Sequence, residues 1–209
     1  MMENQSRFEE ITNSSLDRFR EKHATRERAI QASREVIRTS ANAIRAIHRN
    51  EMDRAKDLVD EAGALVAETK TLLIDHPDLY FTGYTQDAQK EYSEARCVYA
   101  FISASELPTA EGIGVETASF LNGLAEAASE LRRYILDSLR RDDDARSEEL
   151  MQLMDDVYSV LVVMDFPDAL TGGLRRTTDQ LRAVLERTRG DLTMTTRQRR
   201  LEHLLAERE

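Results

Sequence analysis

Cysteine, proline, glycine and aromatic residues are all scarce in this sequence. Among 209 residues there are 1 Cys, 3 Pro, 8 Gly and no Trp. The single cysteine, Cys97, excludes an internal disulfide framework and a thiolate-rich zinc site, and it suits a reducing cytosol. The low proline and glycine content excludes a collagen-like or proline-rich chain, and 6% of aromatic residues is low for an all-β chain. These absences leave an all-α protein as the expectation.

Long apolar runs are also missing. No stretch reaches the roughly 18 residues of a membrane-spanning helix, and the N-terminus has no apolar core of a signal peptide. We therefore expect a soluble, cytoplasmic protein that has no membrane partner. Neither a linker nor an internal repeat divides the chain, so we expect one helical domain over residues 1–209.

Charge is plentiful, and its sign changes along the chain. The net charge is −10, from 29 basic and 39 acidic residues. Residues 18–49 carry nine bases against three acids, residues 175–200 carry eight against three, and residues 50–174 have a net charge of −16. The two basic segments predict either a local phosphate-binding face or ordinary solvated helix faces. The acid excess with only four lysines is typical of a halophile's salt-rich cytoplasm, although high genomic GC content produces the same arginine bias.

The spacing of apolar residues predicts seven helices and no strand. The first is longer than a compact bundle of this mass needs, and such a helix is usually supported by partner subunits. Asn50 is expected to cap the second helix, and Gly190 to end the sixth. The seven predicted ranges are about 5–49, 51–76, 85–105, 115–140, 145–164, 170–189 and 193–206.

Three glutamates are candidates for a metal site. Glu91 and Glu94 are three residues apart, so their carboxylates share one face of a helix whose apolar neighbours indicate burial. A buried pair of like charges must be protonated, paired with arginine or bound to a cation. Glu126 lies in an apolar segment of the next helix, where Gly123 permits a close approach between the two helices. Such carboxylates could hold Mg²⁺ for phosphodiester hydrolysis, but the same spacing is common on solvated helices.

Other catalytic arrangements are missing from the sequence. The four histidines form no Glu-x-x-His or His-x-x-x-His pattern, which disfavours a di-iron bundle and a helical zinc hydrolase. No glycine-rich phosphate loop is present, and Gly172-Gly173 is expected to be a helix junction. Cys97 has no basic partner and is expected to be a buried apolar side chain.

Several separated segments resemble the translin/Trax family in its archaeal form. The segment from Asp165 to Arg176, DFPDALTGGLRR, is similar to the family's D-[FY]-P-x-x-x-T-x-G-L-R-R motif. Residues 188–191, TRGD, are similar to its T-R-G-[DE] segment, and residues 89–101 and 120–133 also match. The resemblance runs in order along most of the chain. It implies a seven-helix subunit that assembles into a hollow homo-octamer and binds single-stranded RNA or DNA.

The same resemblance implies roles for individual residues. Trax subunits carry a metal-dependent ribonuclease site with a Q-E-Y-x-E-A motif, which Lys90 to Ala95 match except at Lys90. The third acid of that site aligns with Glu126, where glutamate replaces aspartate and is one methylene longer. Glu91, Glu94 and Glu126 are therefore predicted to be catalytic, holding Mg²⁺ or Mn²⁺ in an endoribonuclease.

Two further functions remain open. A translin-like shell would bind nucleic acid through arginine–phosphate contacts without hydrolysing it, and a scaffold would not bind nucleic acid at all. The adjacent arginines 175 and 176 are equally consistent with a structural role at a helix or subunit interface. The four predicted nucleic-acid-binding residues are Arg34, Arg38, Arg175 and Arg176.

Overall fold

The computed structural model describes residues 2–141 and 145–207, and within these ranges it has helices and no strand. The all-α class expected from the sequence is confirmed. Three single-turn helices connect six long ones, and none of the described helices is long and apolar enough to cross a membrane. The long helices are α1 (Met2–His48), α2 (Met52–Leu72), α4 (Gly83–Ser103), α6 (Thr117–Leu139), α7 (Ser147–Val162) and α9 (Leu174–Ala206); the short ones are α3 (Pro77–Tyr80), α5 (Ala110–Ile113) and α8 (Asp168–Thr171).

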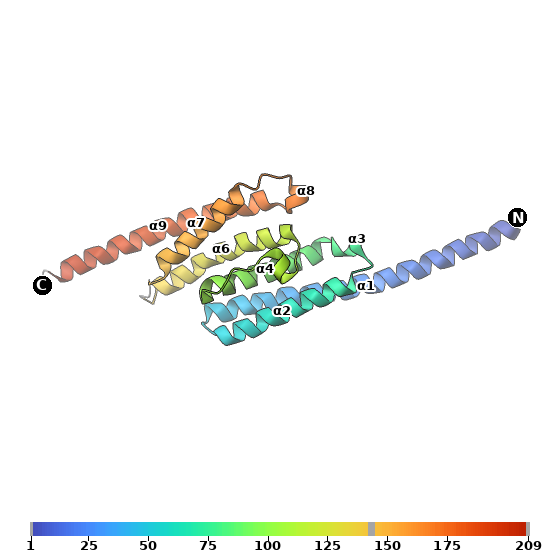
Figure 1. Cartoon of the computed structure of the whole chain (residues 1–209), viewed down its shortest axis with the longest axis horizontal. Helices are drawn as coiled ribbons and strands as arrows, with labels where there is room; N and C mark the ends of the chain where they lie inside the picture. Colours follow the sequence, from blue (N-terminus) through green and yellow to red (C-terminus); the bar gives the residue numbers. More distant parts are fainter. Residues whose placement is uncertain (1, 142–144, 208–209) are drawn as a thin grey trace.

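The helices form layers, with α4 and α6 packed together at the centre. Helices α1 and α2 cover α4 on one side, and α7 and α9 cover α6 on the other (Figure 1). Apolar side chains at helical spacing pack against one another between the layers. The burial of their surface away from water is the main contribution to the stability of such a bundle. Fully buried side chains in this core include Ile47, Leu131, Ile135, Met154 and Leu181.

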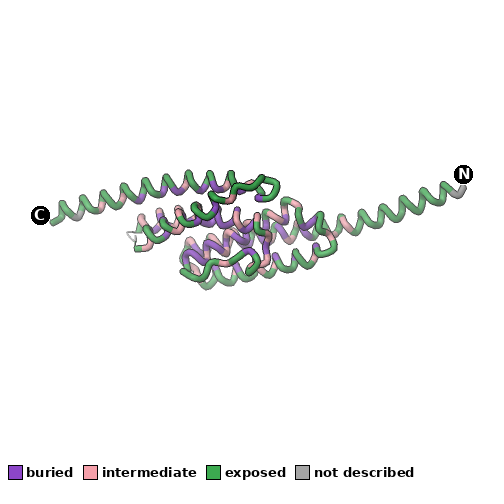
Figure 2. Tube along the Cα trace, turned by 45° about the horizontal axis from the view of Figure 1, so that its top comes forward, coloured by how far each residue is buried: buried purple, intermediate pink, exposed green. Residues whose placement is uncertain are grey.

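The two longest helices extend beyond the bundle in opposite directions. The N-terminal part of α1 leaves the body as a single exposed helix, and the C-terminal part of α9 does so at the other end (Figure 2). The long first helix predicted from the sequence is therefore present. Both projecting segments carry large exposed apolar side chains, namely Phe8, Ile11 and Phe19 on α1 and Leu201, Leu204 and Leu205 on α9.

Gly190 does not end a helix, so the prediction of separate sixth and seventh helices is wrong. Helix α9 continues through this position, which gives six long helices instead of seven in the described residues. A glycine inside a helix costs about 1 kcal/mol relative to alanine. Its two neighbours are tied to other helices: Arg189 Nη2 lies 2.6 Å from Asp155 on α7, and Asp191 lies 2.8 Å from Arg132 on α6. These tertiary contacts offset the weak helix propensity of glycine.

Two local predictions at helix starts also need correction. Asn50 adopts a left-handed conformation with φ of 60°, and the residue that flanks the start of α2 is Glu51. Asparagine tolerates this conformation because its short polar side chain interacts with its own backbone. Between the predicted helices 51–76 and 85–105, where the sequence predicted no helix, lies the single turn α3. In contrast, Gly172-Gly173 is the expected junction, since both glycines have positive φ between α8 and α9.

Candidate metal centre and the groove beside it

Three glutamate side chains converge where α4 and α6 cross. Glu91 and Glu94 extend from α4 and Glu126 from α6, and each offers a carboxylate oxygen within 4.8 Å of the other two. All three residues are partly buried. The structure thus brings together the three acids that were selected from the sequence. We call them the acidic cluster.

The two helices can approach because Gly123 has no side chain. A Cβ at this position would lie 2.5 Å from the backbone oxygen of Lys90 and 2.7 Å from the Cβ of Ser93. These distances are well below van der Waals contact, so only glycine permits this crossing. Glu126 follows Gly123 by three residues and therefore lies on nearly the same face of α6, toward α4. The close approach predicted from Gly123 is confirmed.

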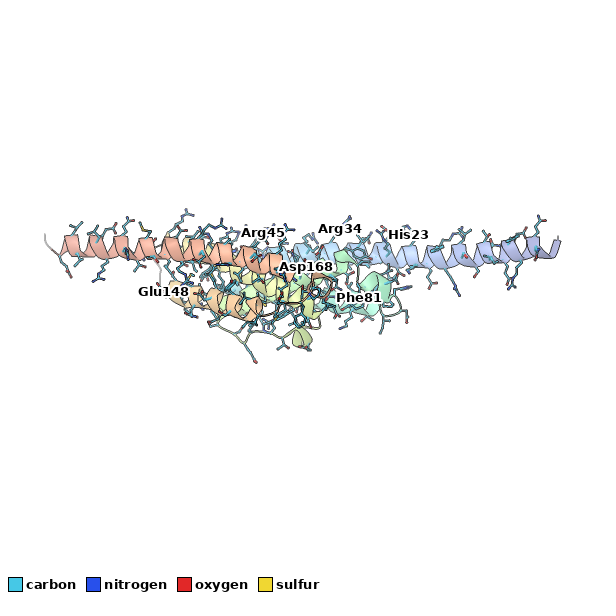
Figure 3. All side chains as sticks on the ribbon, turned by 90° about the horizontal axis from the view of Figure 1, so that it is seen from above. His23, Arg34, Arg45, Phe81, Glu148 and Asp168 are labelled. Atoms are coloured by element: carbon cyan, nitrogen blue, oxygen red, sulfur yellow. The ribbon has the colours of Figure 1, made fainter. Side chains whose placement is uncertain are left out.

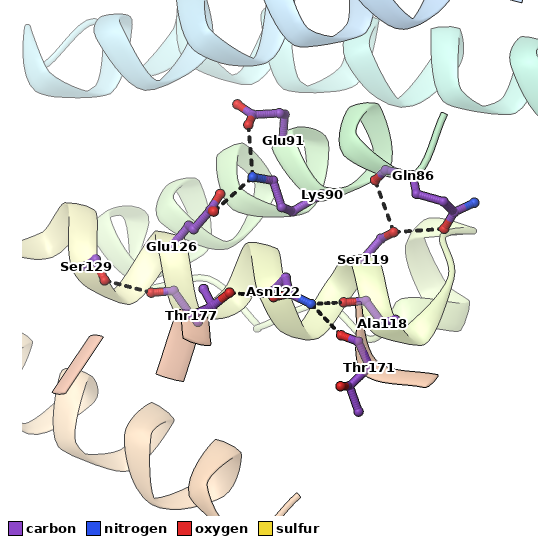
Figure 4. Close-up of polar contacts among 11 residues, drawn as sticks. Gln86, Lys90, Glu91, Ala118, Ser119, Asn122, Glu126, Ser129, Thr171 and Thr177 are labelled. Atoms are coloured by element: carbon purple, nitrogen blue, oxygen red, sulfur yellow. Dashed lines mark hydrogen bonds and ion pairs between the residues drawn. The ribbon is translucent and has the colours of Figure 1, made fainter. Parts of the chain in front are cut away.

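Lys90 is also part of this site. Its ammonium group donates a hydrogen bond of 2.9 Å to Glu126 Oε1 and lies 3.4 Å from Glu91 Oε1 (Figure 4). Burial lowers the pKa of Lys90, but the bonds to these two carboxylates leave it above its ordinary value. Lys90 is therefore a cation at neutral pH, and it neutralises part of the charge of the cluster.

Glu94 is the carboxylate with the least compensation. Burial, together with the negative charges of Glu126, Glu91 and Glu130, raises its pKa to about 8, and Lys90 opposes this rise. The single ammonium group of Lys90 does not balance the three carboxylates of the acidic cluster. The donor set of hard oxygen atoms, together with this excess of negative charge, fits a divalent cation such as Mg²⁺.

Glu130 is a fourth acid that the sequence analysis missed. It lies four residues after Glu126 on the same face of α6, and this spacing was the available signal. Its Oε1 is 2.6 Å from Nε2 of His48 at the end of α1, and the His48 side chain is only 5% exposed. With Glu94 and Glu126, it lines a depression of about 290 Å³ between α6 and α9. His48 thus fixes Glu130 beside the acidic cluster.

A groove of about 870 Å³ begins at the acidic cluster and extends toward α8. Lys90 and Glu126 line its inner end, and Phe81 and Leu170 form apolar parts of its wall. Arg176, at the start of α9, also lines it. Among the residues that the structure describes, the guanidinium group of Arg176 has no hydrogen-bond or ion-pair partner. An unpaired guanidinium in a groove can bind phosphate in a bidentate manner.

A buried asparagine holds this wall of the groove together. Asn122 on α6 donates a hydrogen bond of 2.8 Å to the backbone oxygen of Thr171, and Thr177 on α9 donates one of 2.6 Å to Asn122 Oδ1 (Figure 4). These bonds fasten both sides of the α8–α9 junction to α6. They therefore fix the position of Arg176 relative to the acids.

The other three predicted nucleic-acid-binding arginines lie elsewhere. Arg175 points away from the groove and forms an exposed ion pair with Asp165. Arg38 pairs with Glu35 on α1, and Arg34 is exposed on the same helix (Figure 3). None of these three arginines lines the groove or the depression beside it. Of the four candidates, only Arg176 lines the groove that begins at the acidic cluster.

Cys97 takes no part in the site. Its side chain is fully buried, and burial raises its pKa to about 12. A thiol in this state is neither a nucleophile nor a metal ligand. The prediction that it is a buried apolar side chain is confirmed.

Comparisons with known proteins identify relatives of this chain. No protein-family model matches the chain. An uncharacterised protein of Methanocaldococcus jannaschii is 31% identical over 173 residues, which are 82% of this chain and 76% of that protein. The solved structures of AfC3PO alone and of its complex with duplex RNA are both 31% identical, with TM-scores of 0.82, and the match covers 90% of this chain and 97% of theirs. AfC3PO is a translin-family protein. This chain belongs to the translin family.

A more distant member extends the likeness of fold. The structure of apo-NeC3PO is 18% identical and has a TM-score of 0.80, with 88% of this chain and 96% of that chain covered. At this level of identity the agreement concerns the fold alone. The translin fold therefore persists while most of the sequence differs.

Proposed function

We propose that this translin-family chain binds single-stranded RNA or DNA and cleaves RNA in a reaction that depends on Mg²⁺ or Mn²⁺. The observation that carries the proposal is the convergence of Glu91, Glu94 and Glu126 from two helices beside a groove that holds the unpaired Arg176. AfC3PO, 31% identical, has been solved in complex with duplex RNA. That complex supports nucleic acid as the ligand of this chain.

The acidic cluster and the groove would have separate tasks. Glu91, Glu94 and Glu126 would hold the metal ion, which when bound supplies a Lewis acid for the phosphate and activates water as a nucleophile. Arg176 would bind a neighbouring phosphate and orient the strand. Glu130, fixed by His48 at 2.6 Å, would keep Glu94 and Glu126 in a strongly negative environment that favours a cation.

Lys90 favours the second candidate, a shell that binds nucleic acid without cleaving it. Its ammonium group contacts two of the three carboxylates, so a metal ion must compete with it for Glu91 and Glu126. If Lys90 keeps these two contacts, no metal ion binds. The carboxylates then only position the ammonium group of Lys90, which attracts phosphate. The two candidates differ in one measurable property, which is cleavage in the presence of metal.

Assembly into a homo-octamer is part of the proposal. The N-terminal part of α1 is a lone helix with exposed Phe8, Ile11 and Phe19. Single helices in water are only marginally stable, and exposed apolar side chains of this size are typical of protein interfaces. Other copies of the chain would cover these side chains. The length of the first helix also predicted support from partner subunits.

Binding and cleavage can be measured together on one labelled single-stranded RNA. Metal-dependent cleavage with salt-sensitive binding is the result that we expect, because phosphate contacts release counterions. Tight binding without cleavage in Mg²⁺ or Mn²⁺ would identify the non-catalytic shell. Absence of binding at any salt concentration would contradict both candidates and would identify a scaffold.

A further inference from the structure

Three depressions follow one another along the line where α6 packs on α9. The groove of about 870 Å³ shares Glu126, Thr177 and Gln180 with the depression of about 290 Å³ at the acids. That depression in turn shares Ser129 and Val184 with a third one of about 420 Å³. Because neighbouring depressions share lining residues, the three lie in a row, which we call the α6–α9 seam. The third depression is lined by Ser129, Arg132, Arg133, Leu136, Asp137, Arg140 and Val184.

Charged side chains of both signs line this seam. The groove end has the unpaired Arg176 and Lys90 with the acids Asp87 and Glu116, the middle has Glu94, Glu126 and Glu130, and the far end has Arg132, Arg133 and Arg140 with Asp137. Arg132 is engaged by Asp191 at 2.8 Å, but Arg133 and Arg140 are mostly exposed and lie 3.6–4.0 Å from their acidic partners on α6. Loose, exposed ion pairs of this kind contribute little and exchange readily for a phosphate.

An aromatic side chain lies at the groove end of the seam. Phe81, labelled in Figure 3, is 64% exposed, and its ring lies edge-to-face with that of Tyr80 at a centroid distance of 5.0 Å. The hydroxyl of Tyr80 donates a hydrogen bond of 2.9 Å to Glu116 on the groove wall. Phe81 is thus an exposed ring that packs on Tyr80, whose own position is fixed by its hydrogen bond to Glu116. Such rings stack on nucleobases and stabilise binding of single strands.

We propose that the α6–α9 seam is a track for one RNA strand, with Glu94 and Glu126 of the acidic cluster in its middle. Arg176 holds a phosphate and Phe81 stacks on a base at one end, and Arg133 and Arg140 hold phosphates at the other. The scissile phosphate then lies between two anchored segments. This inference rests on the proposed function and adds to it the path of the substrate and an unpaired base as the recognised feature.

The chemistry of the seam favours a single strand over a duplex or a protein partner. The face of a base in a duplex is covered by its neighbours, so Phe81 can stack only on a base that has left the duplex. Arginines toward both ends of the seam, with Glu94 and Glu126 between them, match the phosphates of a strand on either side of a bound metal ion.

Binding to a fluorescent oligouridylate tests the track without depending on cleavage. All variants are made in a Glu94→Gln background with Mg²⁺ present, and fluorescence anisotropy gives the Kd. Phe81→Ala, Arg176→Ala and the double variant Arg133→Ala/Arg140→Ala are each expected to raise the Kd about fivefold or more, since one stacked base or one lost charged contact has this effect. Phe81→Tyr should retain the affinity.

Two matched controls separate the track from general effects on the surface. Phe166 is similarly exposed, at 61%, and Arg54 is an exposed arginine on α2, but neither lines the seam. Phe166→Ala and Arg54→Ala should leave the Kd unchanged. A blunt RNA duplex of two strands, which has no unpaired bases, should bind the Phe81→Ala variant as well as it binds the parent, whereas loss of the fold would weaken the binding of both ligands.

The outcomes also distinguish the track from the proposed ribonuclease. If the seam variants weaken oligouridylate binding but the wild-type protein does not cleave RNA, the track is supported and the cleavage proposal is wrong. If the protein cleaves RNA and no seam variant changes the Kd, the track is wrong and the cleavage proposal stands. Equal effects of the seam variants and the two controls would also overturn the track.

Discussion

The backbone oxygen of Lys90 lies where a side chain on Gly123 would have to be. A Cβ added to Gly123 would come within 2.5 Å of this oxygen and 2.9 Å of the backbone nitrogen of Glu94. Both contacts are with backbone atoms, which cannot rotate away as a flexible side chain can. This crossing of α4 and α6 sets the spacing of the acidic cluster.

Replacing Gly123 by alanine should therefore separate the two helices. We expect Gly123→Ala to destabilise the fold by about 1–3 kcal/mol, as overpacking does, and to weaken binding of Mn²⁺. Urea denaturation and calorimetric titration measure the two effects. The matched control is Gly190→Ala in α9, where a Cβ meets nothing within 4 Å, and which should stabilise the protein by about 0.5–1 kcal/mol. Equal stabilities of the two variants would contradict this account of the crossing.

Lys90→Gln should strengthen metal binding. The substitution removes the ammonium group that contacts Glu91 and Glu126, so a cation no longer competes with it. The loss of one charge-assisted hydrogen bond corresponds to about a tenfold lower Kd for Mn²⁺ by calorimetric titration. Lys56→Gln, which removes an exposed lysine paired with Asp60 on α2, should leave this Kd unchanged. An unchanged Kd in Lys90→Gln would show that the lysine does not compete.

The metal-free protein should lose stability as the pH rises from 4.5 to about 8, because the pKa of Glu94 lies near 8 in the folded protein and near 4.5 when unfolded. Between these values the folded protein binds more protons than the unfolded chain, and stability falls with increasing pH. Glu94→Gln cannot ionise and should lack this loss. Urea denaturation in EDTA at both ends of this pH range measures the free energy of unfolding of both proteins. The stability of Glu94→Gln relative to the wild type should increase with pH, and a difference that stays constant would contradict the prediction.

Phe19→Asp should reduce the mass of the assembly. Phe19 is 71% exposed on the projecting part of α1, where a charge cannot enter an apolar contact with another copy without a large desolvation cost. Light scattering of the wild type should give the mass of an octamer, and that of the variant a smaller one. Ile74→Asp, at an exposed apolar residue between α2 and α3, serves as the control. A monomeric wild-type protein would contradict the proposed assembly into an octameric shell.

The sequence was sufficient for the features that depend on local patterns. Helical periodicity predicted the long α1, and Gly123 predicted the close crossing that brings Glu126 to α4. Features that depend on tertiary contacts were not accessible in this way. The continuity of α9 through Gly190 depends on ion pairs with other helices, and the contacts of Lys90 depend on how α4 and α6 cross.

The four arginines illustrate the same limit. A basic motif identifies charged residues, but helix geometry decides which of them face the acids. Arg175 and Arg176 are adjacent on α9, and yet only Arg176 lines the groove, since consecutive residues point in different directions around a helix. Glu130 was recognisable only by extending the spacing from Glu126 by one further helical turn.

Cleavage of a labelled single-stranded RNA tests the central claim most directly. The assay compares the wild type with Glu94→Gln, in Mg²⁺ or Mn²⁺ and in EDTA, and uses Glu106→Gln as the control because Glu106 is exposed and outside the acidic cluster. We predict cleavage by the wild type and by Glu106→Gln in metal only, and none by Glu94→Gln, which still binds RNA. Cleavage that persists in EDTA or in Glu94→Gln would contradict a metal-dependent site at this cluster.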